Sequence, residues 1–317
     1  MIAAGHSAPQ RAARGPAADR AWETAQRAAI ASVCVALILI TMKGWAVYRT
    51  GSIAVLGSLA DSGLDLIASL ITLGGVRWAA RPADDDHRFG HGKAEALSAF
   101  SQVMIILASS AYILWSAVER LLNPAPPVAP EAGIGVSVVG VILTVLLIRY
   151  QARAIRETGS VAIATDRLHY VSDLVVNLSV IAALVLEPLL HVRGADAVFG
   201  IGIALYLALG AVRSGGEAID VLMDKEWDEP DVERLCEAAR SVPQVRLVHE
   251  VRTRGRGLDR FAQFHIWVDP GMTVAAAHDV VDSVEAAVGR AFPGIELLVH
   301  IDPEGHFDAR PGPAKRA

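Results

Sequence analysis

The chain has 317 residues, of which 53% are hydrophobic and 20% are charged, and its 29 basic and 34 acidic side chains give a net charge of −5. The apolar content excludes an intrinsically disordered chain, and the presence of only two cysteines excludes a disulfide scaffold. The mild acidity argues against nucleic acid as a partner. Residues 223–317 hold 29 of the 63 charged residues, which indicates an apolar membrane domain followed by a water-soluble C-terminal domain.

The ends of the chain are predicted to be disordered. Residues 1–21 are rich in alanine, arginine and proline, and the apolar run that follows is too long for a signal peptide, so we expect an uncleaved tail. A second tail rich in glycine and proline is predicted at 305–317. Between the tails, we expect a membrane domain at 22–222 and a cytoplasmic domain at 223–304.

Six stretches of the membrane domain are predicted to cross the bilayer as helices, which takes about 20 mostly apolar residues each. Four basic residues lie in each of the N-terminal tail, the second connection and the fourth connection, whereas the alternate connections carry one each. By the positive-inside rule, both termini are cytoplasmic. Lys43, near the outer end of the first span, is expected to extend to the interface and to play no part in transport. The predicted spans are 28–48, 52–76, 96–118, 132–148, 168–186 and 197–212.

Two pairs of ionisable residues interrupt these spans. Asp61 and Asp65 in the second span, and His169 and Asp173 in the fifth, are each four residues apart, so each pair shares a helical face. An aspartate at mid-membrane costs about 2.5–3.5 kcal/mol, so three of them require a cation, protonation or water. Three carboxylates and one imidazole suit tetrahedral Zn²⁺ and accept Fe²⁺, Co²⁺ or Cd²⁺. The alternative is a polar clamp of protonated aspartates that hydrogen-bond between helices.

The same four residues bind protons once a metal ion leaves, because carboxylates and imidazoles are bases. This predicts that metal export is exchanged for inward proton flow. No covalent bond changes in such a cycle, so we expect a transporter and not an enzyme. Two alternatives behave differently: a membrane-anchored metal sensor binds zinc without flux, and a passive divalent-cation channel conducts without regard to the proton gradient.

The connection after the second span offers a second set of metal-binding side chains. His87 and His91 are four residues apart and follow three consecutive aspartates, at 84–86. Histidine and aspartate clusters are common metal ligands, but loops are also polar for solubility alone. The sequence therefore leaves open whether this connection binds a metal or is only a hydrophilic turn.

The C-terminal domain shows an αββαβ order of elements. Amphipathic patterns predict helices at 229–241 and 274–292, and alternating patterns predict strands at 245–253, 261–268 and 295–301. Residues 254–257 are expected to form the turn between the first two strands. This order fits a ferredoxin-like α+β sandwich in which two helices cover one face of the sheet.

Four motifs carry a resemblance to a known family. Together they resemble cation diffusion facilitators, most closely the bacterial zinc and ferrous-iron efflux type, over residues 25–304. The resemblance implies a six-helix transmembrane domain and a metallochaperone-like C-terminal domain, assembled as a homodimer in the lipid bilayer of the bacterial inner membrane. The motifs are L-A-D-S-G-L-D at 59–65, P-A-D-D-D-H-R-F-G-H-G-K-A-E at 82–95, R-L-H-Y-V-S-D at 167–173 and L-V-H-I-D-P at 298–303.

The resemblance also implies roles for individual residues. It places the two ionisable pairs at the family's transport site, and it selects Asp84, His87 and His91 from the loop. Lys93 and Asp224 match positions of an interlocked ion pair at the domain junction, which we favour over the alternative of two solvated boundary charges. A lone histidine in the C-terminal domain would be an ordinary surface residue, but the resemblance assigns a two-metal site near the subunit interface to His249, His265, His278, His300 and Asp302.

Overall fold

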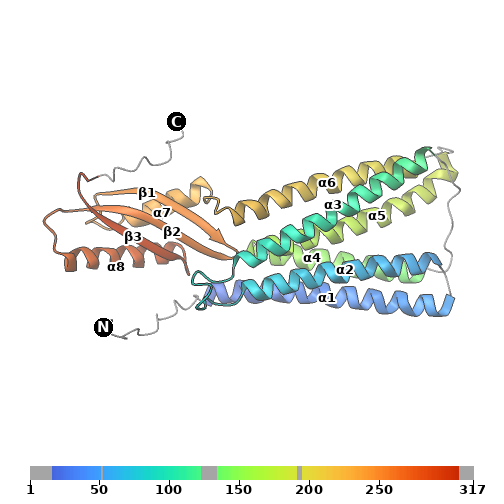
Figure 1. The fold of residues 1–317 in the computed structure, drawn as a ribbon, viewed down its shortest axis with the longest axis horizontal. Helices are drawn as coiled ribbons and strands as arrows, with labels where there is room; N and C mark the ends of the chain where they lie inside the picture. Colours follow the sequence, from blue (N-terminus) through green and yellow to red (C-terminus); the bar gives the residue numbers. More distant parts are fainter. Residues whose placement is uncertain (1–15, 51–52, 123–133, 191–194, 307–317) are drawn as a thin grey trace. The chain divides into compact units, whose positions relative to one another are not determined.

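The computed structural model describes residues 16–50, 53–122, 134–190 and 195–306 (Figure 1). The disorder predicted for residues 1–15 and 307–317 lies outside the described residues. The chain divides into two compact units. Within the described residues, the membrane unit comprises 21–82 and 90–222, and the C-terminal unit comprises 223–306 with the segments 16–20 and 83–89.

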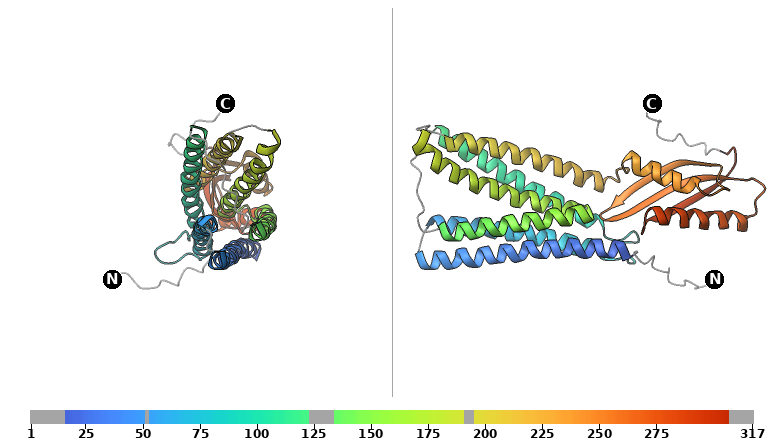
Figure 2. Two further views of the ribbon diagram at one scale, coloured as in Figure 1. Left: turned by 90° about the vertical axis from the view of Figure 1, so that its right-hand side faces the viewer. Right: turned by 180° about the vertical axis from the view of Figure 1, so that it is seen from behind.

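The membrane unit contains six long helices that run alongside one another (Figure 2). Within the described residues, four of them contain a stretch long and apolar enough to cross a membrane, namely Asp19–Arg49, Ser58–Ala79, Lys93–Glu119 and Val138–Thr158. The last two helices cover the fifth and sixth predicted spans, and their crossing stays a prediction. The six are α1 (Pro16–Thr50), α2 (Ile53–Ala79), α3 (Lys93–Leu122), α4 (Ile134–Thr158), α5 (Val161–Leu190) and α6 (Ala195–Leu222).

Helix α1 starts earlier than the sequence analysis predicts. It begins at Pro16, whereas the disordered tail was expected to extend to residue 21. Proline suits the first helical position because its fixed φ is helical and its missing N–H would have no partner there. Asp19 in the first turn also complements the positive end of the helix dipole. These local signals outweigh the polar composition of the segment.

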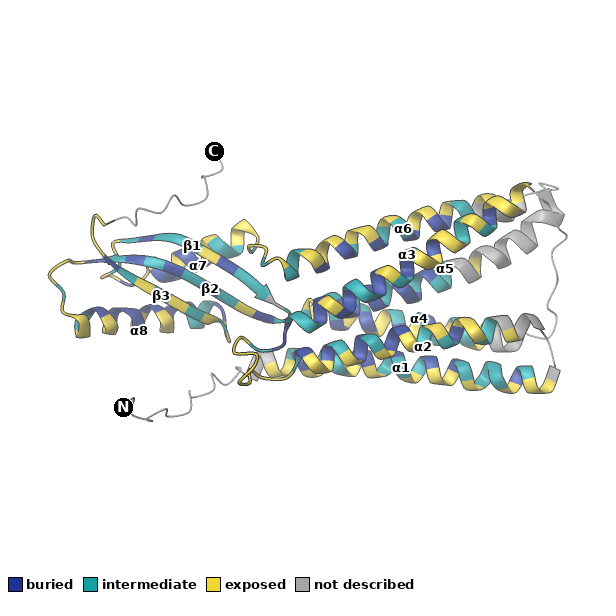
Figure 3. Ribbon diagram, viewed as in Figure 1, coloured by how far each residue is buried: buried dark blue, intermediate teal, exposed yellow. Residues whose placement is uncertain are grey.

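The membrane helices expose apolar side chains and bury small and polar ones (Figure 3). Tyr112, Trp115 and Leu209 are each more than 60% exposed, and Ser69, Gln102 and Gln151 are each at most 1% exposed. A soluble protein rarely shows so extensive an apolar surface. The distribution is that of a helix bundle whose outer surface faces lipid and whose small and polar side chains lie between helices.

A glycine on α2 permits close contact with α3. A Cβ atom placed on Gly75 would lie 2.3 Å from the Cβ and Oγ atoms of Ser98, which is far inside contact distance. The neighbouring Gly74 has nothing within 4 Å of the same position. Packing therefore requires a glycine at Gly75 but not at Gly74.

The C-terminal domain has the predicted αββαβ order. It consists of α7 (Glu229–Arg240), β1 (Leu247–Arg256), β2 (Asp259–Val268), α8 (Val274–Ala291) and β3 (Glu296–Pro303). The sheet order is β1-β2-β3, with β2 antiparallel to β1 and parallel to β3. The turn between β1 and β2 is shorter than predicted, because pairing continues to Arg256 and Asp259. Gly257, with φ of 62°, provides the left-handed conformation that this short turn requires.

The two faces of this sheet differ. Alternate residues of β2, such as Phe264 and Ile266, are buried in a core with side chains of both α7 and α8. The residues between them, including His265, point to the opposite face, which the helices do not cover. Residues 305 and 306, which were predicted to belong to the disordered tail, are described, and the indole N–H of Trp267 donates to the carbonyl of His306 at 2.8 Å.

Candidate metal centres

The fifth and second helices bring three predicted ligands together inside the membrane unit. His169 and Asp173 lie one turn apart on α5, and Asp65 faces them from α2. The His169 Nε2 atom is 3.1 Å from Asp65 Oδ1 and 3.6 Å from Asp173 Oδ2. Ligand atoms of the three residues all lie within 4.8 Å of one another, and the His169 side chain is 8% exposed. Two carboxylates and one imidazole at this spacing can coordinate a divalent cation.

Asp61, the fourth predicted ligand, lies outside this group. It is one turn before Asp65 on α2 and is exposed. The four-residue spacing predicts a shared helical face, but it does not fix how far around the helix that face points. As described, the cluster offers three protein ligands, and Asp61 stays a predicted fourth.

The expectation that Lys43 extends to the interface is wrong, whereas its lack of a part in transport stays a prediction. Its ammonium group does not extend to the interface but donates hydrogen bonds to the Ser58 carbonyl at 3.0 Å and the Ser62 hydroxyl at 2.7 Å, both on α2. An ammonium group in an apolar bundle is more favourable when it binds helix oxygens and lies near acids than when it is unpaired. Its charge interacts with those of Asp65, Asp61 and Asp173. Lys43 is therefore the positive charge beside the predicted transport site.

The sequence analysis missed a buried acid one turn before this cluster. Asp166 on α5 is 0% exposed and accepts hydrogen bonds from Ser32 Oγ (2.6 Å), Gln151 Nε2 (2.7 Å) and Gln102 Nε2 (3.1 Å). It precedes His169 by three residues and Asp173 by seven, so the three acids and bases form one stripe along α5. That spacing was visible in the sequence, but the adjacent Arg167 led us to assign the segment to the connection between two spans.

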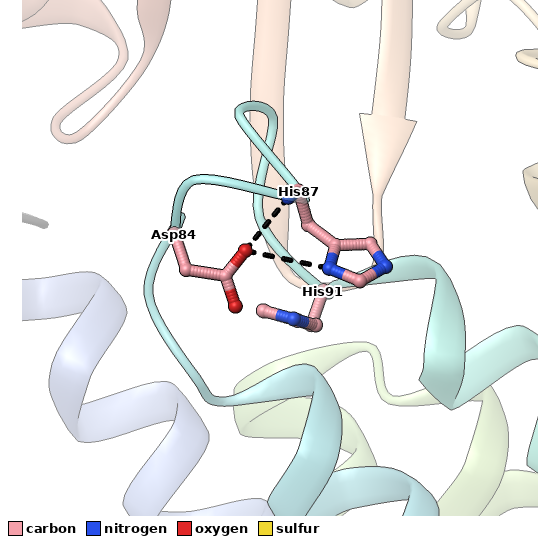
Figure 4. A group of neighbouring side chains, drawn as sticks. All are labelled: Asp84, His87 and His91. Atoms are coloured by element: carbon pink, nitrogen blue, oxygen red, sulfur yellow. Dashed lines mark hydrogen bonds and ion pairs between the residues drawn. The ribbon is translucent and has the colours of Figure 1, made fainter.

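The loop after α2 brings together the three residues that the resemblance selects, as Figure 4 shows. Asp84 Oδ1 accepts hydrogen bonds from the backbone N–H of His87 (2.7 Å) and of Asp86 (3.1 Å), and lies 3.4 Å from His87 Nδ1. Ligand atoms of Asp84, His87 and His91 lie within 4.8 Å of one another. Asp85 instead lies 3.2 Å from the Arg88 guanidinium. Of the three aspartates, Asp84 is the one positioned as a ligand.

The C-terminal sheet aligns three histidines across its uncovered face. In the strand register, His249 pairs with His265, and His265 pairs with His300. Asp302 follows two residues later on the same strand face, and its Oδ2 lies 2.8 Å from His265 Nδ1 and 3.5 Å from His249 Nε2. His249, His265 and Asp302 form a group whose ligand atoms lie within 4.8 Å. This donor set fits a divalent metal ion such as Zn²⁺.

Two further residues extend this group and one does not. His300 Nε2 lies 3.3 Å from Asp302 Oδ1, although its side chain is 61% exposed. Glu250, which the sequence analysis did not select, lies 3.8 Å from His265 because a β-bulge after His249 gives it a φ of 48°. The His278 side chain is exposed on α8 and lies 3.9 Å from Asp282, and its role in the site stays a prediction.

The proposed partners Lys93 and Asp224 each have a contact within their own unit. Lys93 Nζ donates to the carbonyl of Leu222, the last residue of α6, at 3.0 Å, and so caps that helix. Asp224 lies 3.6 Å from the Arg254 guanidinium. The ion pair between Lys93 and Asp224 stays a prediction.

These features define an α-helical membrane protein with a cluster of potential metal ligands between its helices and a second one in a small α+β domain. Two family models match the chain: the cation efflux transmembrane domain over residues 29–223, and the cation efflux protein cytoplasmic domain over residues 227–304. The chain therefore belongs to the cation diffusion facilitator family of cation-efflux transporters, as the sequence motifs predicted.

Curated relatives and solved structures are similar to the chain. The cation-efflux pump FieF of Salmonella arizonae and that of Salmonella newport are each 39% identical over 277 residues, which are 87% of this chain and 92% of the relative. The zinc form of CzrB is 33% identical and covers 26% of this chain and 97% of that chain, with a TM-score of 0.24. The cadmium form of a MamM CTD variant is 41% identical and covers 24% and 95%, with a TM-score of 0.23.

Proposed function

We propose that the protein is a homodimeric proton-coupled antiporter that exports Zn²⁺ from the cytoplasm, with Fe²⁺, Cd²⁺ and Co²⁺ as alternative cargo. It lies in the bacterial inner membrane with six spans and both termini in the cytoplasm. Its C-terminal domain is a ferredoxin-like dimerisation domain. The metal ion binds between α2 and α5 and is released on the other side of the membrane after the ligands turn outward.

The cluster of Asp65, His169 and Asp173 carries this proposal. Two carboxylates and one imidazole within 4.8 Å attract a divalent cation strongly, and all three groups bind protons when the cation leaves. Asp61 supplies the fourth ligand when α2 rotates toward α5. Metal and protons therefore compete for the same atoms, and a proton gradient can drive the metal out. The name of the FieF relatives, cation-efflux pumps, supports export as the direction.

The cytoplasmic clusters regulate or stabilise the transporter. Asp84, His87 and His91 bind metal in the loop on the entry side. The histidine row and Asp302 hold metal in the C-terminal domain near the subunit interface, with His278 as an additional ligand. The cytoplasmic-domain family model that matches residues 227–304, which is named ZT_dimer, supports a homodimer. Lys93 and Asp224 form the ion pair at the domain junction.

Metal flux in proteoliposomes tests the proposal. Zn²⁺ and Fe²⁺ flux is measured for the wild type and Asp173→Ala, with and without an imposed pH gradient. Asp279→Ala is the matched control, because Asp279 is an exposed carboxylate on α8. We expect Zn²⁺ flux that follows the gradient, disappears in Asp173→Ala and persists in Asp279→Ala.

The alternatives give other results. Flux that ignores the gradient indicates a passive channel. Tight Zn²⁺ binding without flux in any condition indicates a membrane-anchored sensor. Either result refutes proton-coupled antiport. Comparison of the two metals identifies the preferred cargo, because a site of two or three carboxylates and one imidazole is compatible with both.

A further inference from the structure

Asp166 is a fully buried acid that none of the three metal clusters includes. Four helices enclose it. Ser32 of α1 and Gln151 of α4 donate to its Oδ2 atom, and Gln102 of α3 donates to its Oδ1 atom. Thr72 of α2 lies next to Gln102 and hydrogen-bonds to it. The carboxylate therefore lies at a point where five helices meet through polar side chains.

The groups that face Asp166 from the other helices are all neutral, namely the two hydroxyls and the two amides. The titratable groups near it, His169 and Tyr170, are on α5 itself and interact with it electrostatically. No basic side chain in the described part of the chain forms an ion pair with Asp166. A buried carboxylate without a cation is costly, so either a nearby positive charge or a proton must compensate it.

The amide of Gln151 can serve both protonation states of this acid. Its Nε2 atom donates to Asp166 Oδ2 at 2.7 Å and to Ser32 Oγ at 3.0 Å, while its Oε1 atom is buried without a hydrogen-bond partner among the described residues. A half-turn of the amide places Oε1 where it accepts the O–H of a protonated Asp166. The Ser32 hydroxyl can likewise change from donating to Asp166 to accepting from it, because a hydroxyl both donates and accepts hydrogen bonds. Gln102 is less free, because its Nε2 also donates to the Ala68 carbonyl at 3.0 Å.

We propose that Asp166 is a proton-binding site, separate from the metal ligands, that loses its proton when a divalent cation binds at Asp65, His169 and Asp173. The proposal rests on the proposed function of that cluster. A divalent ion adds two positive charges one helical turn from Asp166, which favours its ionised form. The O–H bond breaks, the proton leaves to water, and the Gln151 amide turns its N–H toward the carboxylate. By linkage, a proton on Asp166 weakens metal binding equally.

Zn²⁺ affinity as a function of pH tests this proposal in the full-length protein without a gradient. Zn²⁺ is titrated between about pH 6 and 8, and binding at the transport site is the difference between each protein and its Asp173→Ala counterpart. In Asp166→Asn, the slope of log Kd against pH is expected to fall by up to about one, because one proton no longer leaves. A purely structural role would change affinity by the same factor at every pH, and an unchanged slope would overturn the proposal.

Two further variants keep the test decisive. Ser32→Ala removes a donor from the same carboxylate but leaves the acid, so the proton should still be released and the full slope retained, with the pH dependence moved to higher pH; a loss of slope as large as that in Asp166→Asn at every pH would overturn the proposal. Gln151→Met serves if Asp166→Asn does not fold. It removes a hydrogen bond that is worth more to a charged carboxylate than to a neutral acid, so the pH dependence should move to higher pH. No movement would also overturn the proposal.

The proton-site proposal and the proposed antiport can be refuted independently of each other. Flux that ignores the pH gradient would refute antiport while leaving the Asp166 slope as measured. A normal gradient-driven flux with an unchanged slope in Asp166→Asn would refute the proton site alone.

Discussion

Replacing Lys43 with methionine tests the positive charge that α1 places beside the proposed transport site. The ammonium group donates to Ser58 and Ser62 of α2, and its charge acts on Asp65, Asp61 and Asp173. It therefore stabilises the ionised acids in the absence of metal and repels a divalent cation that binds to them. Methionine keeps the length and the apolar stem of the side chain but removes the charge. We expect the variant to bind metal more tightly and to release it more slowly.

The size of the effect follows from the geometry. Lys43 Nζ lies 2.7 Å from Ser62 Oγ, and Ser62 is three residues before Asp65 on α2. Residues at this spacing have Cβ atoms about 5–6 Å apart, so a metal ion on Asp65 lies about 8 Å from the ammonium group. Repulsion between one and two charges at about 8 Å is about 4 kcal/mol at an effective dielectric constant near 20, and about 1 kcal/mol in water. Zn²⁺ affinity should therefore rise at least about fivefold.

Calorimetric Zn²⁺ titration and zinc flux together check this prediction. Affinity at the transport site is taken as the difference from the Asp173→Ala background, and flux is measured at saturating zinc. Lys43→Arg is the matched control, because it keeps the charge and should keep an affinity near that of the wild type. Tighter binding with slower flux supports the reasoning. Unchanged or weaker Zn²⁺ binding in Lys43→Met, with a folded protein, would show that the ammonium group does not oppose the metal.

Three other predictions concern the C-terminal sites and packing. His265→Ala should lower Zn²⁺ affinity in the C-terminal domain more than His278→Ala does, because only His265 lies in the cluster, and calorimetry that ranks them in reverse contradicts this. Gly75→Ala should destabilise the protein by about 1–3 kcal/mol through overpacking against α3, whereas Gly74→Ala should be neutral or stabilising in thermal unfolding; equal effects refute it. Burial raises the pKa of the Cys236 thiol, so iodoacetamide at pH 8 should modify it slowly in the folded chain and quickly after denaturation, and rapid labelling before denaturation argues against that burial.

The regular elements of the C-terminal domain were predictable because their patterns are local. Alternation of apolar residues predicted a strand at 261–268, and the structure extends it only to Asp259. The turn was misplaced because residues 254–256 are polar and glycine-rich, which is typical of a loop. Cross-strand pairing, such as that of Arg254 with Phe261, extends the hairpin, and no pattern within one strand reports its partner.

The membrane cluster was predictable in part, for the same reason. Four-residue spacing correctly indicated that His169 and Asp173 share a face, and the cost of charge in the membrane indicated that Asp65 would need a partner. Spacing carries no information on the rotation of α2 about its axis. Asp61 satisfies the same spacing as Asp65, yet only Asp65 faces α5 closely enough to join the cluster.

Lys43 and Asp166 are charged residues whose environment is misjudged when each helix is analysed alone. Both lie toward a helix end, where an ionisable side chain is expected to reach water, and both instead point into the bundle. Their energies depend on what faces them from other helices: hydroxyl and carbonyl oxygens for Lys43, and amide and hydroxyl donors for Asp166. The stripe formed by residues 166, 169 and 173 was nevertheless visible in the sequence. For Asp166, its place on one helical face with the buried His169 and with Asp173 therefore predicts burial better than its distance from the end of an apolar run does.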